Sequence, residues 1–205
     1  MALLTEAETR QVSDAIARVE KTTDAELVTV LARQADEYHY IPSLWAALIA
    51  LISPGIILFT PFWLDVVEIV MIQLAVFLVM AVTLRIPPVL RRIIPKGVKQ
   101  WRAANLARRQ FLENNLHHTE GETGLLIFVS ETERYVEIIA DRGISQHVPD
   151  TEWQAIVDAF TRRVHAGKTL EGFLYAVEAC GSLLAQHVPA THERNELPDH
   201  MILID

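Results

Sequence analysis

Two apolar runs in the first half of the chain limit its possible folds more than any other feature. The first, residues 41–64, has no charged side chain in 24 positions, and the second, residues 69–84, has none in 16. A helix needs about 20 mainly apolar residues to cross a hydrocarbon core of roughly 30 Å. Because the link between the runs is short, two such helices must be antiparallel. We therefore expect a transmembrane hairpin over residues 41–86, with spans at about 41–62 and 66–86.

A buried hairpin inside a soluble helical protein is the alternative interpretation of the same runs. A helix on the surface of a soluble core keeps a polar stripe toward water, and neither run has one. In lipid, by contrast, a helix satisfies its own backbone hydrogen bonds along its whole length. The pattern favours an integral membrane protein whose two spans contact lipid.

The charges beside the runs predict how the hairpin is inserted. Residues 85–109 hold 8 of the 18 Lys and Arg side chains and no acid, whereas the hairpin tip carries Asp65 and Glu68 and no base. Cytoplasmic loops are enriched in Lys and Arg, and a basic segment beside a span also attracts anionic headgroups. We expect a membrane protein with both termini and the soluble domain in the cytoplasm, and residues 87–96 as a basic linker on the membrane surface. A basic run can instead bind nucleic acid, but its position directly after a span argues against a nucleic-acid partner.

About 160 residues remain outside the hairpin, enough for one domain with its own core. The first 20 residues are acidic and amphipathic, which is not the pattern of a secretory signal. The single cysteine, Cys180, excludes an internal disulfide. We expect one discontinuous domain formed by residues 1–40 and 97–190, with residues 191–205 as a C-terminal tail.

Hydrophobic periodicity predicts a mixed order of helices and strands in this domain. The expected elements are a helix at 5–20, a strand at 25–32, a helix at 97–116, strands at 124–130 and 134–140, and two further helices that begin near 150 and 169. Capping boxes are expected at Thr5 with Glu8 and at Thr151 with Gln154. The order predicts an α/β fold, a small α/β/α sandwich interrupted by the hairpin after its first strand.

Several stretches of the sequence resemble the TPM domain, a family that includes a thylakoid lumen phosphatase and a photosystem-associated protein. They are TDAELV at 23–28, GLLIFVS at 124–130, ERYVEIIADRGI at 133–144, and the helix opened by Pro149 and Asp150 that contains Trp153. The resemblance covers residues 5–40 and 97–188 and implies the TPM fold. Residues 195–199 also look like the ending of a bacterial membrane-anchored branch, and this resemblance implies a bacterial protein of the plasma (inner) membrane. Many TPM proteins have a signal peptide and a domain outside the cytoplasm, whereas here we expect no signal peptide and a domain that faces the cytoplasm.

The resemblance also implies where chemistry could reside. Some TPM domains are acid phosphatases and carry an acidic calcium-binding patch, and the acids at matching landmarks are Glu26, Asp141 and Asp150. Calcium takes several oxygen ligands, so clustered carboxylates at strand and helix ends would suit it. Simpler interpretations are open for each: Asp150 as a helix N-terminal acid, Asp141 as a solvated turn residue, and Glu26 as an outward-facing or Arg-paired side chain.

No motif in the sequence predicts a catalytic residue. H-E-x-x-H, C-x-x-C, G-x-S-x-G and the P-loop pattern are all absent. We therefore expect a membrane-anchored, TPM-like interaction or assembly-assisting module with a membrane protein as its partner. The alternative, by analogy with the family, is a calcium-dependent, phosphatase-like hydrolase that uses the region of Asp141 and Asp150.

Overall fold

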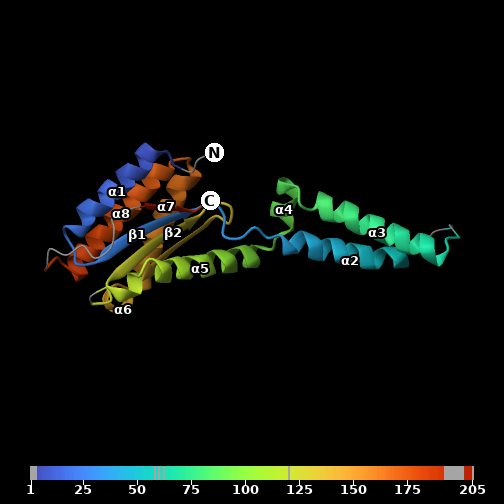
Figure 1. The fold of residues 1–205 in the computed structure, drawn as a ribbon. Helices are drawn as coiled ribbons and strands as arrows, with labels where there is room; N and C mark the ends of the chain where they lie inside the picture. Colours follow the sequence, from blue (N-terminus) through green and yellow to red (C-terminus); the bar gives the residue numbers. More distant parts are fainter. Residues whose placement is uncertain are drawn as a thin grey trace. The chain divides into compact units, whose positions relative to one another are not determined.

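A computed structural model describes residues 4–57, 59, 61, 63–119, 121–191 and 201–204. Residues 195–199, which contribute to the family resemblance, lie outside the described residues, as do parts of the hairpin link. The chain forms two compact units, one made of Met1–Ala35 with Gln100–Asp205 and the other of Asp36–Lys99 (Figure 1). The hairpin therefore belongs to a unit of its own, inserted into a domain that continues on both sides of it in sequence.

The first unit is built on a four-stranded sheet in the order β3-β2-β1-β4. Its strands are β1 (Glu26–Ala32), β2 (Gly124–Ser130), β3 (Tyr135–Ala140) and β4 (Met201–Ile204). β1 runs parallel to β2 and to β4, whereas β3 is antiparallel to β2. Every residue of β1 and β2 is buried, as expected for continuous apolar strands that are covered on both faces.

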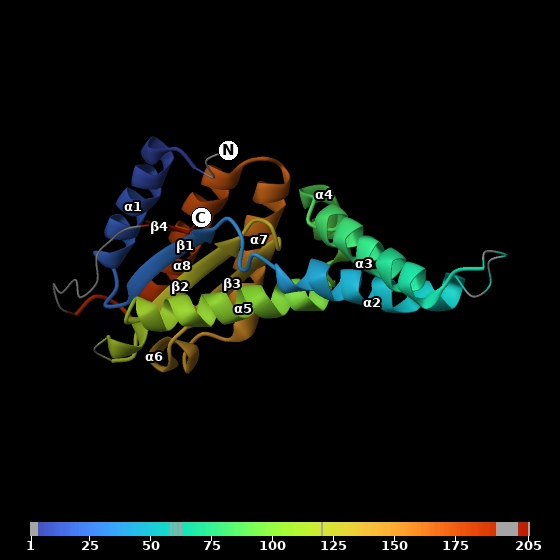
Figure 2. The same cartoon turned by 45° about the vertical axis from the view of Figure 1, so that its right-hand side comes forward.

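Helices cover both faces of this sheet. The helices α1 (Glu6–Glu20), α7 (Asp150–His165) and α8 (Thr169–His187) share one core with the inward side chains of β1 and β2. The helix α5 (Lys96–Glu113) covers the opposite face through Ala103, Ala107 and Phe111, and Figure 2 shows the helices on either side of the strands. The predicted α/β/α sandwich is confirmed.

Local capping signals were correct at one helix and wrong at another. At α1, the backbone N–H of Glu8 donates to Thr5 Oγ1 (3.3 Å) and that of Thr5 donates to Glu8 Oε2 (2.8 Å), so the expected capping box is present. At α7 the box with Thr151 is absent, because the helix already begins at Asp150. The Gln154 amide donates to Asp158 Oδ1 (2.9 Å) instead.

The end of the chain is not simply a tail. Residues 201–204 form β4, which pairs in parallel with the second half of β1 and places Met201 in the core. The expectation that residues 191–205 lie outside the domain is wrong for this segment. Its four residues are too few to predict a strand by periodicity, and only the free edge of β1 makes them one.

The second unit contains α2 (Tyr40–Ile57), α3 (Val66–Thr83) and the short α4 (Pro87–Ile93). α2 and α3 pack against each other as a hairpin (Figure 1), and each has 18 residues, a length of about 27 Å. Both are long and apolar enough to cross a membrane. Asp65 and Glu68 form a capping box that begins α3.

Candidate acidic site at one end of the sheet

The fold brings two of the three predicted acids into one row across the sheet. Glu26 begins β1 and lies opposite Gly124, the first residue of β2. Asp141 follows the last residue of β3, and its backbone N–H donates to the Gly124 carbonyl (2.9 Å). Glu26 and Asp141 are therefore two strand spacings apart, about 10 Å between backbones, on either side of Gly124.

The backbone of Leu116 lies very close to Gly124, between the two acids of this row. A Cβ at Gly124 would lie 2.2 Å from the carbonyl oxygen of Leu116 and 2.9 Å from its Cβ. The 3-10 helix η1 (Leu116–His118) thus rests on the sheet directly at the position between the two acids. Only glycine leaves room for that backbone.

The Asp141 side chain caps the short helix that follows it. One of its carboxylate oxygens accepts a hydrogen bond, and the other has no partner among the described residues. Its Oδ1 accepts a hydrogen bond from the backbone N–H of Arg142 (2.7 Å) at the start of α6 (Arg142–Ser145). Its Oδ2 is shielded from solvent and has no hydrogen-bond partner among the residues that the structure describes. A buried carboxylate oxygen without a donor is costly, which makes this oxygen the unusual atom of the row.

Glu26 is buried, with 5% of its surface exposed. Alternation along β1 places its side chain on the α5 face, together with Val28. Its backbone N–H donates to the Thr123 carbonyl (3.2 Å), which ties the start of β1 to the residue before β2. Of the interpretations left open by the sequence, the outward-facing one is wrong for this residue.

Asp150 belongs to a different element from the other two acids, the helix α7. It is exposed at the first position of α7, where an acid is favoured by the helix dipole. Within the described ranges, no three His, Cys, Asp or Glu side chains gather closely enough to hold a metal ion. The calcium role of Glu26, Asp141 and Asp150 stays a prediction.

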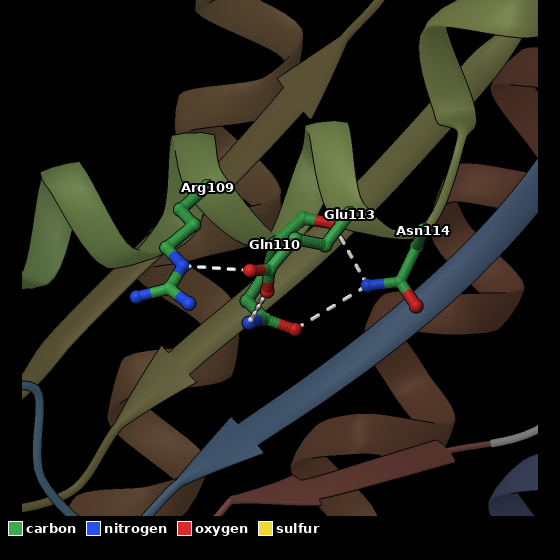
Figure 3. A network of polar contacts seen from close by, with 4 residues as sticks. All are labelled: Arg109, Gln110, Glu113 and Asn114. Carbon is green, nitrogen blue, oxygen red and sulfur yellow. Dashed lines mark hydrogen bonds and ion pairs between the residues drawn. The ribbon is translucent and has the colours of Figure 1, made fainter.

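A polar network that sequence reasoning did not identify fixes the turn leading to η1. Figure 3 shows Glu113 accepting from Arg109 Nε (2.7 Å) and from Gln110 Nε2 (2.8 Å). Asn114 Nδ2 donates to the Gln110 carbonyl (2.8 Å), and Asn115 then adopts a left-handed conformation with φ 56°. These hydrogen bonds lie at the end of α5, where the chain turns toward η1 and its contact with Gly124. The residues of this network are three or four positions apart in the sequence, and that spacing is the signal from which their contacts could have been predicted.

A second buried carboxylate, that of Glu133, lies at the opposite end of the parallel strands β1 and β2. Glu133 is buried in the turn between β2 and β3, and its Oε2 accepts from the hydroxyl of Ser130 and from the backbone N–H of Ala35 (3.1 Å). This carboxylate connects that turn to the segment that leaves β1. No local pattern could predict this contact, because Ala35 and Glu133 are 98 positions apart.

Comparison with known proteins agrees with this architecture. Residues 92–183 match the family model of the TPM domain. The NMR structure of the BA42 protein from the psychrophilic bacterium Bizionia argentinensis superposes with a TM-score of 0.61 at 18% sequence identity, covering 98% of this chain and 95% of that one. At that identity the likeness shows the fold alone. No curated protein matches the sequence. Residues 92–183 are therefore a segment that matches the TPM domain, within a fold that this chain shares with BA42.

Proposed function

We propose that this protein is a membrane-anchored TPM domain protein that acts at the cytoplasmic surface of a bacterial inner membrane as an interaction or assembly-assisting module. The observation that carries the proposal is α3, an 18-residue apolar helix none of whose residues is buried in the protein. A soluble domain does not expose an apolar surface of this kind to water. A bilayer is the solvent that would accept it.

The free energy of burial supports this assignment. Many large apolar side chains of the hairpin are well exposed, among them Leu51 at 69%, Val66 at 77% and Val82 at 70%. Each gains about 1.5–3 kcal/mol when it leaves water. Summed over two helices, this exceeds the roughly 5–15 kcal/mol that holds an ordinary domain folded, so the hairpin strongly favours lipid.

The segment that follows α3 supports the orientation. α4 packs against the start of α2 through a cluster whose buried members are Tyr38, Ile41 and Ile94. The side chains of Arg85, Arg92 and Lys96 in this segment are exposed. Cations beside a span favour the cytoplasmic side and attract anionic lipid, which supports a cytoplasmic domain.

Vesicle flotation tests the anchor. The full chain should float with phospholipid vesicles and stay with them in alkaline carbonate. Leu74→Arg with Leu78→Arg in α3 should reduce flotation sharply, since each arginine at the centre of a span costs about 2.5–3.5 kcal/mol. Leu112→Arg on α5, another exposed leucine, is the matched control and should float like the unmodified chain. A chain that remains in solution would refute the anchor.

A calcium-dependent, phosphatase-like hydrolase is the second candidate. It is favoured by one observation, the shielded Asp141 Oδ2 in the row with Glu26, which lacks a donor among the described residues. Calcium that binds only the folded state raises stability by about 2.7 kcal/mol at a hundredfold excess over its Kd. Melting curves with calcium should therefore shift upward, and Asp141→Asn should abolish the shift.

Asp14→Asn, at an exposed position of α1, is the matched control for this titration and should keep the calcium response. Hydrolysis of a generic phosphomonoester should follow the same pattern as the melting shift. An unchanged melting temperature together with no hydrolysis would eliminate the hydrolase and leave the anchored module unaffected.

A further inference from the structure

Gln73 is an unusual residue for its place in the hairpin. It is the eighth of the 18 residues of α3, near the middle of the span, and is flanked by apolar residues. Its side chain is half-buried. No hydrogen bond joins its amide to any residue that the structure describes.

The other polar side chains of the two helices differ from Gln73 in this respect. The hydroxyls of Ser43, Ser53 and Thr83 each donate to a backbone carbonyl three or four residues earlier. Glu68 belongs to the capping box at the start of α3. A glutamine amide is too polar to remain unpaired in hydrocarbon, where no water replaces the missing bonds.

Gln73 lines an open groove between the two helices of the hairpin. The groove has a volume of about 520 Å³. Its other lining residues are all apolar: Leu44, Ala47, Leu48, Ala50, Leu51, Val70, Leu74 and Phe77. α2 therefore offers the amide no side-chain partner there, and an acyl chain in the groove could not form a hydrogen bond.

The chemistry of the amide indicates its partner. A carboxamide has an NH₂ group that donates hydrogen bonds and an oxygen that accepts them. Two copies of the chain related by a twofold axis can therefore form two hydrogen bonds between the same carboxamide in each copy. Residues 41–64 and 69–84 carry no charged side chain, so no charge within these runs would repel a second copy. Polar side chains commonly join helices in this way in membranes.

We propose that Gln73 pairs with Gln73 of a second copy of this chain, which makes the groove face of the hairpin a homodimer interface within the membrane. The inference rests on the proposed membrane insertion. Val70 and Phe77, three residues before and four after Gln73, lie on the same helix stripe and line the same groove. They would pack across the interface.

Self-association of the full chain in phospholipid vesicles tests the pairing, with energy transfer between two fluorophore-labelled populations as the readout. Gln73→Leu should weaken association roughly threefold to thirtyfold, the range measured for interhelical hydrogen bonds in membranes. Gln73→Asn, which keeps an amide, should lose less. Met71→Leu is the matched control, because Met71 is 61% exposed and lies about 200° around the helix.

Cysteine cross-linking locates the interface. In a Cys180→Ala background, Phe77→Cys should form an intermolecular disulfide on oxidation, Met71→Cys should not, and adding Gln73→Leu should lower the Phe77→Cys yield. The proposal is overturned if the chain inserts into vesicles but stays monomeric, or if it associates equally well with Gln73→Leu. A chain that stays out of the vesicles would overturn membrane insertion itself.

Discussion

Single side chains in this protein take their properties from the elements packed around them, and Tyr135 is the clearest case. Burial, followed by the charge and the hydrogen bond of Glu137, raises the pKa of Tyr135 to about 12, against a smaller opposing effect of Arg108. The phenol donates to Glu137 Oε2 (3.0 Å). The neutral phenol is thus the form that the folded domain favours.

The domain should therefore lose stability at high pH through this group. The raised pKa contributes stability that is fully present below about pH 10, the ordinary value, and is lost as the pH rises toward 12. Melting temperatures measured from pH 9 to 12 should fall more steeply for the unmodified chain than for Tyr135→Phe. Parallel curves for the two proteins would contradict the assignment.

Cys180 should be inert in the native protein. It is fully buried in α8, and burial raises the pKa of its thiol, so little reactive thiolate forms near neutral pH. Iodoacetamide at pH 8 should leave the native chain unlabelled and should label it in denaturant. Rapid native labelling would show that α8 opens locally.

At the scale of elements, close packing decides how α1 and α8 fit together. Gly181 in α8 faces Val19 of α1, and a Cβ there would lie 2.6 Å from both methyl carbons of Val19. Valine has little rotameric freedom in a helix, so it cannot easily move away. The glycine is needed for contact between these two helices.

The same contact predicts that the effect of Gly181→Ala on stability depends on the side chain at position 19. Gly181→Ala should destabilise the otherwise unmodified domain by about 1–3 kcal/mol, because overpacking exceeds the gain in helix propensity. In a Val19→Ala background both methyl carbons are gone and only the Cβ of residue 19, at 3.1 Å, remains close. Gly181→Ala should therefore destabilise much less there, since the gain in helix propensity, up to about 1 kcal/mol, offsets the remaining tight contact. Denaturant unfolding of the four proteins measures both effects, and an equal effect in both backgrounds would show that Val19 is not the obstacle.

At the scale of the whole molecule, the insertion of the hairpin between β1 and β2 is the defining feature. The chain leaves the sheet after β1, passes through α2 and α3, and returns to the sheet through α5. In the proposed membrane-anchored protein, the two spans would place both connections to the domain on one side of the membrane, and the basic segment after α3 would favour the cytoplasmic side.

Cysteine labelling in intact cells checks this topology. In a Cys180→Ala background, Trp63→Cys at the fully exposed hairpin tip should react with a membrane-impermeant maleimide added outside. Glu131→Cys, exposed in the β2–β3 turn, should react only after the cells are opened. The opposite pattern would reverse the proposed orientation.

Local signals in the sequence predicted the elements of this protein well. The apolar runs predicted α2 and α3, the run GLLIFVS matches β2 at both ends, and the Thr5–Glu8 spacing predicted the start of α1. These features depend on residues a few positions apart, whose side chains meet within one helix turn or alternate along one strand. Neither requires knowledge of the rest of the chain.

Contacts between distant residues were decided only by the tertiary structure. Periodicity could not show that residues 201–204 would pair with β1, that Glu26 and Asp141 would flank Gly124, or that Glu133 would reach Ala35. Each depends on the strand order and register, which place residues about 100 or more positions apart side by side. The sequence by itself determined an apolar helical hairpin within an α/β domain, whereas sheet pairing decided which polar groups meet, because register is a property of the assembled sheet.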